Sequence, residues 1–202
     1  MIAVLRAAVA AAFVFVPAAS WAQQAAPLRG AALVDALRGG GYVILMRHAA
    51  TEAKVDAPTV VVADCSTQRN LSPEGRATAR AIGARVTALA LPIADVKASP
   101  YCRALESARL IFGRADPVAG LHEFAVKDAA ASADAAAALR PLLVASPPAG
   151  KDTVVVTHGF NVKSVTGLDV LEGEAVVVKP DARGGYTIVG DIKADDWSTF
   201  TT

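Results

Sequence analysis

Short apolar runs alternate along the chain with segments whose apolar residues recur at helical spacing. Residues 42–46 and 153–156 are continuous apolar runs that predict strands buried on both faces of a sheet, and residues 96–98 form another short strand candidate. Residues 175–178 and 186–189 predict two further strands. A turn rich in Pro and Gly joins these two, so we expect them to be antiparallel at one edge of the sheet.

Helices are predicted between these strands. Residues 31–38 have helical spacing and end in three consecutive glycines. Ser72 followed by Pro73 is typical of a helix start, with Ser as N-cap and Pro at the first helical position. The alanine-rich residues 129–139 predict a surface helix, because alanine is the strongest helix former.

The pair Ser99 and Pro100 repeats the same start signal and predicts a helix that carries Arg103 in its first turn. Strands that alternate with helices predict an α/β fold, here a three-layer α/β/α sandwich around a mostly parallel central sheet. With 202 residues, of which 53% are hydrophobic and 19% charged, the chain is expected to form one compact domain over residues 31–202.

The N-terminus has the layout of a secretory signal peptide. Arg6 precedes an uncharged run over residues 7–16, and small residues follow up to Ala22. We expect residues 1–22 to be removed after Ala22, and residues 23–30 to form a flexible tail. An uncleaved anchor is the alternative, but the apolar run is shorter than the roughly 20 residues that cross a bilayer. We therefore predict a periplasmic or secreted protein with no stable membrane insertion after cleavage.

Charge excludes some partners. The formal net charge is +1, and it becomes zero when Arg6 is removed. This balance gives no support for binding to nucleic acid or to acidic membranes. Nothing in the sequence indicates an oligomeric state.

The chain has two cysteines, Cys65 and Cys102. In an oxidising compartment they are candidates for a structural disulfide. Two free, buried thiols are the alternative that the residues leave open.

Two of the three histidines follow predicted strands directly. His48 comes after residues 42–46, and His158 comes after residues 153–156. Ligands of open α/β sheets bind outside the carboxyl ends of the strands, where these two side chains are expected to meet. Arg47 and Arg103 add positive charge, so the expected ligand is an anion such as a phosphoryl group. Taken alone, each histidine would be interpreted as a structural residue, and each arginine as one partner of a surface ion pair.

Four segments, in order, resemble the motifs of the histidine phosphatase superfamily, the phosphoglycerate-mutase-like proteins. Its Arg-His-Gly-x-Thr signature resembles residues 47–51 (RHAAT), although Ala49 stands where many members have Gly. The others are residues 71–75 (LSPEG), 99–108 (SPYCRALESA) and 157–159 (THG). The resemblance implies a phosphoglycerate-mutase-like fold.

The resemblance also implies a mechanism. His48, as neutral imidazole, attacks phosphorus and becomes a phosphohistidine. Arg69 is a further candidate for contact with substrate, with a surface arginine as the alternative. The residues expected to bind the phosphoryl oxygens are Arg47, Thr51, Arg69, Arg103 and His158.

The leaving group needs a proton, which a carboxylic acid usually supplies in this family. Glu123 fits the usual place, with Asp116 and Asp128 as competitors, and the chosen group needs a raised pKa to donate at neutral pH. His122 is expected to be a loop residue. Metal-binding motifs such as His-Glu-x-x-His and Cys-x-x-Cys are absent from the sequence, so neither a metal nor another cofactor is predicted.

The sequence thus predicts a metal-independent phosphomonoesterase acting on a small phosphorylated metabolite or an envelope sugar phosphate. The signal peptide together with residues 65–72 (CSTQRNLS) resembles exported members related to the lipopolysaccharide core heptose phosphatases. Export argues against a mutase of glycolysis. A phosphohistidine protein phosphatase and a catalytically silent phospho-ligand-binding protein remain the alternatives.

Overall fold

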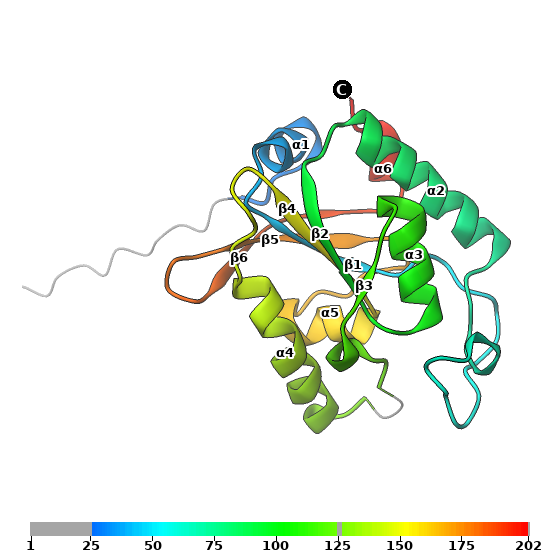
Figure 1. Cartoon of the computed structure of the whole chain (residues 1–202). Coiled ribbons are helices and arrows are strands. Elements are labelled where there is room, and N and C mark those ends of the chain that lie inside the picture. Colours follow the sequence, from blue (N-terminus) through cyan, green and yellow to red (C-terminus); the bar gives the residue numbers. More distant parts are fainter. Residues whose placement is uncertain (1–25, 125–126, 202) are drawn as a thin grey trace, which may run out of the picture.

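A six-stranded mixed sheet forms the centre of the structure, a computed structural model that describes residues 26–124 and 127–201. The strand order is β3-β2-β4-β1-β5-β6 (Figure 1). The strands are β1 (Val43–Arg47), β2 (Ile93–Ala98), β3 (Asp116–Pro117), β4 (Asp152–Thr157), β5 (Ala175–Pro180) and β6 (Tyr186–Ile192). The predicted signal peptide over residues 1–22, with its cleavage site after Ala22, lies outside the described residues.

Strand directions follow the sequence pattern. β1, β4, β2 and β3 are parallel, whereas β5 runs antiparallel to β1, and β6 antiparallel to β5. The predicted antiparallel pair at one edge of the sheet is therefore confirmed. Successive residues of β1 face opposite cores, with Ile44 and Met46 on one side and Val43 and Leu45 on the other.

Helices cover both faces of the sheet, so the predicted α/β sandwich is confirmed (Figure 1). One face packs against α1 (Gly30–Gly39), α2 (Pro73–Ala88), α3 (Cys102–Phe112) and the short α6 (Asp196–Thr199). The other face packs against α4 (Ala129–Val144) and α5 (Gly159–Thr166). None of the helices in the described ranges has both the length and the hydrophobicity that a membrane span requires.

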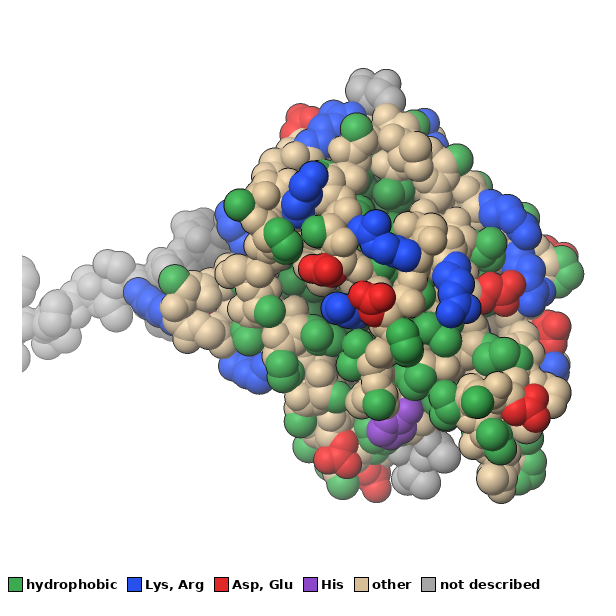
Figure 2. All heavy atoms as spheres, in the orientation of Figure 1, with side chains coloured by type: hydrophobic (Ala, Val, Ile, Leu, Met, Phe, Trp, Pro, Cys, Tyr) green, Lys and Arg blue, Asp and Glu red, His purple; other side chains and the backbone are tan. Residues whose placement is uncertain are grey.

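Surface charge is mixed. On the face drawn in Figure 2, Lys and Arg side chains lie among Asp and Glu side chains. This distribution agrees with the small formal net charge of the chain.

The helix starts agree with the sequence in one case and differ in another. Ser72 is the N-cap of α2, and its hydroxyl accepts a hydrogen bond from the Gly75 amide at 3.0 Å, as predicted. The predicted cap at Ser99 is wrong, because α3 begins at Cys102 with Tyr101 as N-cap. The Ser99 hydroxyl is instead 2.8 Å from His158 Nε2, so it serves the site and not the helix.

The expected N-terminal tail is shorter than predicted. The Leu28 amide donates to the Val189 carbonyl at 2.7 Å, and its side chain packs partly buried against the core. Helix α1 already begins at Gly30. The prediction of a flexible tail over residues 23–30 is therefore wrong at its C-terminal end, because edge-strand pairing fixes the backbone there.

The segment between β1 and α2 has little regular structure. It contains the 3₁₀ turn η1 (Cys65–Thr67) and one antiparallel bridge between Thr51 and Leu71. Val61 and Val62 in this segment are 50% and 39% exposed. A disulfide joins Cys65 to Cys102, 37 positions apart, and so ties this segment to the start of α3.

Helix α2 approaches the backbone after β1 closely at Gly75. A Cβ added there would lie 2.0 Å from the Ala50 carbonyl oxygen, and that atom belongs to the loop directly after His48. Only glycine permits this approach without movement of the loop.

Gly75→Ala is expected to lower the free energy of unfolding by about 1–3 kcal/mol, because it overpacks a rigid backbone contact. Gly39→Ala is the matched control, since a Cβ at this last residue of α1 has no heavy atom within 4 Å. We expect the control to change stability by less than about 0.5 kcal/mol. Urea unfolding measures both, and equal effects would contradict the assigned contact.

Candidate active site

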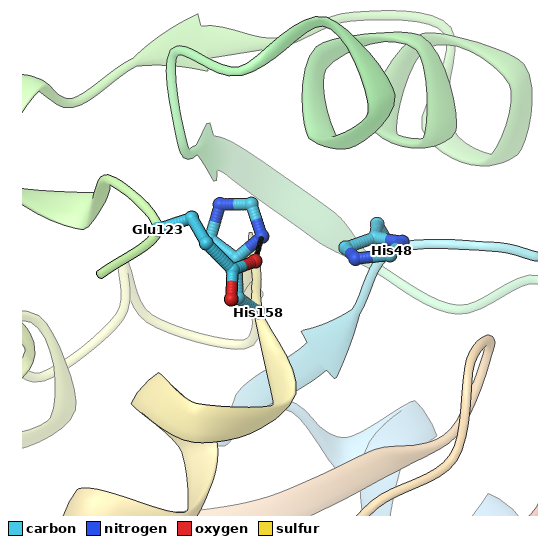
Figure 3. A group of neighbouring side chains, drawn as sticks. All are labelled: His48, Glu123 and His158. Carbon is cyan, nitrogen blue, oxygen red and sulfur yellow. Dashed lines mark ion pairs between the residues drawn. The ribbon is translucent and has the colours of Figure 1, made fainter. Parts of the chain in front are cut away.

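Two histidines meet at the carboxyl ends of neighbouring parallel strands. Arg47 ends β1 opposite Thr157, the last residue of β4, and His48 and His158 follow these two residues. The centroids of the two imidazole rings are 5.4 Å apart. Figure 3 shows His158 against Glu123, with His48 at the end of its strand on the other side. The structure thus brings together the two side chains that the sequence placed at equivalent strand ends.

The hydrogen bond of His48 defines which nitrogen is free. Its Nδ1 lies 2.9 Å from the carbonyl oxygen of Ala49, which can only accept, so Nδ1 carries the proton and Nε2 keeps its lone pair. The side chain is 1% exposed. Burial lowers the pKa of His48 well below 6.5, and the charges of His158, Arg103 and Arg47 lower it further. The ring is therefore a neutral imidazole with an available nucleophilic nitrogen.

His158 has a polar neighbour at each nitrogen. Nε2 lies 2.8 Å from the Ser99 hydroxyl, and Nδ1 lies 2.9 Å from Glu123 Oε2. Burial lowers the pKa of His158, although the contact with Glu123 acts in the opposite direction. The ring of Tyr101 packs edge-on against His158 at 5.3 Å between centroids. These contacts fix the orientation of the second imidazole.

Glu123 is ionised in this state. Burial acts to raise its pKa, but His158 and Lys127 outweigh burial and hold the pKa of Glu123 well below 4.5. Lys127 Nζ lies 2.9 Å from Glu123 Oε1, and Arg103 NH2 lies 3.2 Å from Oε2. The raised pKa expected of a general acid is thus not found in the ligand-free site. A bound phosphate would supply a neighbouring negative charge that raises the pKa of Glu123.

The competing carboxylates are engaged elsewhere. Asp116 of the edge strand β3 pairs with Lys97 of the neighbouring strand β2 at 3.1 Å. Asp128 is the N-cap of α4 and accepts a hydrogen bond from the Ala131 amide. His122 packs against the ring of Phe124, as a loop residue would. Glu123 is therefore the candidate among them that contacts a site histidine.

Arg103 is a fully buried cation held by two carboxylates. Its side chain is 0% exposed, and it pairs with Asp56 at 3.1 Å and with Glu123 at 3.2 Å. It also donates to the Arg69 carbonyl at 3.2 Å. Sequence reasoning missed Asp56, because it lies in a segment without periodic pattern and its role depends on a contact 47 positions away.

Arg47 and Thr51 share a second carboxylate. Arg47 NH1 donates to the Val170 carbonyl at 2.9 Å, and NH2 lies 3.6 Å from Glu172. Thr51 donates to the same Glu172 carboxylate at 2.9 Å and is not among the cavity-lining residues. Glu172 is 4.0 Å from His48 Nδ1, so this missed residue lies beside the candidate nucleophile. A carboxylate in a loop gave no signal that would have found it.

A cavity of about 380 Å³ opens in front of these groups. The Nε atoms of Arg47, Arg69 and Arg103 are all buried and have no hydrogen-bond partner among the described residues. Arg47 and Arg69 line the cavity, whereas Arg103 and His158 are not among its lining residues. Buried donors without partners are costly, so the two in the lining point to an acceptor bound in the cavity. The cavity is lined by Arg47, His48, Arg69, Glu123, Lys127, Gly159, Phe160, Lys163, Asp169 and Val170.

The charge of the lining favours an anion. Four lining side chains are basic and two are acidic, and Lys127 and Lys163 were not foreseen from the sequence. His48, Glu123 and His158 offer ligand atoms within 4.8 Å of one another and so form a group that could hold a metal ion. Arg103 and Lys127 already neutralise Glu123, however, so a further cation would meet repulsion where an anion meets attraction.

Comparisons with known proteins agree with this geometry. Residues 43–142 match the family model of the histidine phosphatase superfamily (branch 1). No curated protein sequence matches the chain.

Solved structures share the fold. A mutant phosphoserine phosphatase from Entamoeba histolytica in complex with phosphoserine has a TM-score of 0.58 at 16% identity, covering 77% of this chain and 98% of that one. A mycobacterial glucosyl-3-phosphoglycerate phosphatase has a TM-score of 0.57 at 14% identity, covering 73% of this chain and 96% of that one. A putative α-ribazole-5′-phosphate phosphatase from Escherichia coli has a TM-score of 0.55 at 16% identity, covering 74% of this chain and 95% of that one. These similarities confirm the predicted phosphoglycerate-mutase-like fold.

Both site imidazoles are expected to stay neutral below pH 6.5. In NMR spectra recorded from pH 8 to pH 5, the ring signals of His48 and His158 should titrate below their ordinary pKa or not at all. The unfolded chain takes up protons at about pH 6.5 and the folded chain does not, so the free energy of unfolding should fall as the pH drops through that value. His48→Gln and His158→Gln assign the signals. Titration of both rings at ordinary values would refute the assigned burial.

Proposed function

Because residues 43–142 match the family model of the histidine phosphatase superfamily, we propose that the chain is a metal-independent phosphomonoesterase that works through a phosphohistidine on His48. One observation carries the proposal. The Nε donors of Arg47 and Arg69, buried and without partners among the described residues, lie in the lining of the cavity into which a neutral histidine with a free Nε2 opens. A tetrahedral phosphoryl group supplies acceptor oxygens for the arginines and an electrophilic phosphorus for the imidazole.

In the first step, His48 Nε2 attacks phosphorus while the bond from phosphorus to the ester oxygen breaks. Arg47, Arg69 and Arg103 bind the equatorial oxygens and stabilise their charge, together with His158. These groups are in place before the substrate arrives, since carboxylates and carbonyl oxygens hold Arg47 and Arg103 in position. The arginines take over the charge stabilisation that a metal ion supplies in other phosphatases.

Glu123 moves the proton in both steps. A substrate phosphate raises the pKa of this carboxylate through like-charge repulsion, so Glu123 binds a proton and gives it to the leaving alkoxide. The resulting carboxylate then accepts a proton from the water that attacks the phosphohistidine. The nitrogen–phosphorus bond breaks, inorganic phosphate leaves, and His48 returns to its neutral form.

The cavity suits a small, polar leaving group. Its lining includes one aromatic side chain, Phe160, and an ion pair between Lys163 and Asp169 at 2.7 Å. A lining that combines an aromatic ring with charged groups is one that sugars and small metabolites can contact. With the predicted export signal and the resemblance of residues 65–72 to heptose phosphatases, we propose a sugar phosphate of the cell envelope, hydrolysed in the periplasm.

The test is turnover of p-nitrophenyl phosphate by purified protein in the presence of a chelator. Wild type is expected to release phosphate, and His48→Ala should lower kcat by about 10⁴-fold or more, because it removes the covalent route. Phosphate binding without turnover over a broad panel of phosphate esters would contradict the proposal and indicate a binding protein. A panel with sugar phosphates, phosphoserine and a phosphohistidine peptide then identifies the substrate class.

Glu123→Gln is expected to affect poor leaving groups most. An alkyl phosphate such as glycerol phosphate needs a proton on its leaving oxygen, so its kcat should fall by about 10²–10⁴-fold, while p-nitrophenyl phosphate should lose far less in the phosphorylation step. Asp128→Asn is the matched control, because asparagine retains the cap of α4. Single-turnover rates measure both, and an equal loss for both substrates would argue against Glu123 as the acid.

A further inference from the structure

Two of the three guanidinium groups proposed to bind phosphate come from segments that meet only through tertiary contacts. Arg69 lies near the end of the irregular segment between β1 and α2, and Arg103 lies in the first turn of α3. Arg103 NH1 donates to the Arg69 carbonyl, and the Arg69 amide donates to Asp56 Oδ1 at 2.6 Å. Asp56 in turn pairs with Arg103. A shift of this segment would therefore move Asp56 and Arg69 away from Arg103 together.

The segment has little apolar burial of its own to hold it. Residues 61–66 are all exposed. In Figure 1 the segment extends from the body of the fold next to α3. Exposed backbone with few buried contacts opens more readily than the core, so its position depends on specific cross-links.

Two of those cross-links end on the residue before Arg103. The disulfide joins Cys65 to Cys102, and the Cys102 amide donates to Gln68 Oε1 at 2.9 Å. Gln68 is 1% exposed and also donates to the Val62 carbonyl at 3.0 Å. We name Cys65, Gln68 and Cys102 the disulfide brace.

We propose that the disulfide brace positions Asp56 and Arg69 against Arg103, so that the affinity for phosphate depends on the oxidation state of the bridge. This proposal rests on the function proposed above and adds positioning residues that do not touch the substrate. The brace acts through the guanidinium groups, which bind the phosphoryl oxygens in both the ground state and the transition state. Its loss is therefore expected to raise KM more than it lowers kcat.

Reduction tests the proposal on the unmodified chain. Dithiothreitol delivers two electrons and two protons, so the bridge becomes two thiols and the reagent becomes its cyclic disulfide. The chain has only two cysteines, so the reductant has no other thiol or disulfide to change. Cys65 is exposed and therefore accessible to the reagent.

The inhibition constant of inorganic phosphate and the KM for p-nitrophenyl phosphate are measured in oxidised, reduced and reoxidised protein. Reduction is expected to raise both by about tenfold, the equivalent of one lost hydrogen bond to a charged group, and reoxidation should reverse it. The double variant Cys65→Ser, Cys102→Ser should have the inhibition constant and KM of the reduced protein, and dithiothreitol should not change them. Equal inhibition constants in oxidised and reduced protein would contradict the proposed positioning role of the disulfide brace.

Two further measurements separate positioning from stability. Val34→Ala removes buried methyl groups from α1, on a helix that contributes no residue to the cavity, and should lower the melting temperature without changing the inhibition constant. If circular dichroism shows that the reduced protein is unfolded, the inhibition constant is measured instead in the oxidised Gln68→Ala variant. An unchanged inhibition constant in that variant would contradict the proposal.

Failure of the brace and failure of the proposed function give different results. Oxidised protein without turnover refutes the phosphatase. Calorimetric titration with phosphate, in the oxidised and the reduced state, still tests the brace in that case. Turnover with phosphate affinity independent of reduction refutes the brace alone.

Discussion

The buried charge of Arg103 is the constraint on which the site depends. A guanidinium with no solvent exposure is costly unless carboxylates and acceptors surround it, and here Asp56 and Glu123 do so. These two carboxylates come from segments far apart in the sequence. Their pairing with one cation brings together the segment after β1, the start of α3 and the loop that carries Glu123. The site is thus assembled around its charge before any ligand binds.

That arrangement explains how the same residues serve two protonation states. Without a ligand, Glu123 is a carboxylate that compensates the charges of Arg103 and Lys127 and contacts the neutral His158. A phosphate dianion takes over this compensation, because it presents more negative charge to the same cations. Glu123 is then released to bind a proton. The low pKa in the ligand-free state is therefore compatible with a role as general acid in the complex.

The sequence predicted the elements that have a regular pattern and missed those set by tertiary contacts. Buried strands and the His48 and His158 positions follow from apolar runs that end at one edge of a parallel sheet. Helix α5 was not predicted, since its eight residues begin with Gly159 and show little periodicity. Ser99 was assigned to a helix cap because its local pattern is that of an N-cap, whereas its hydroxyl binds His158. Asp56 and Glu172 lie in irregular segments, where no local signal reveals a partner more than 40 positions away.

The proposed mechanism requires that His48 form a covalent bond to phosphorus. Rapid quenching of wild type with a slow phosphate ester, followed by peptide mass spectrometry, tests it directly. We expect a phosphoryl group on the peptide that contains His48, stable in alkali and lost in acid, and absent from His48→Ala. A phosphoryl group on another residue, or turnover with no trapped intermediate under conditions where dephosphorylation limits the rate, would contradict it.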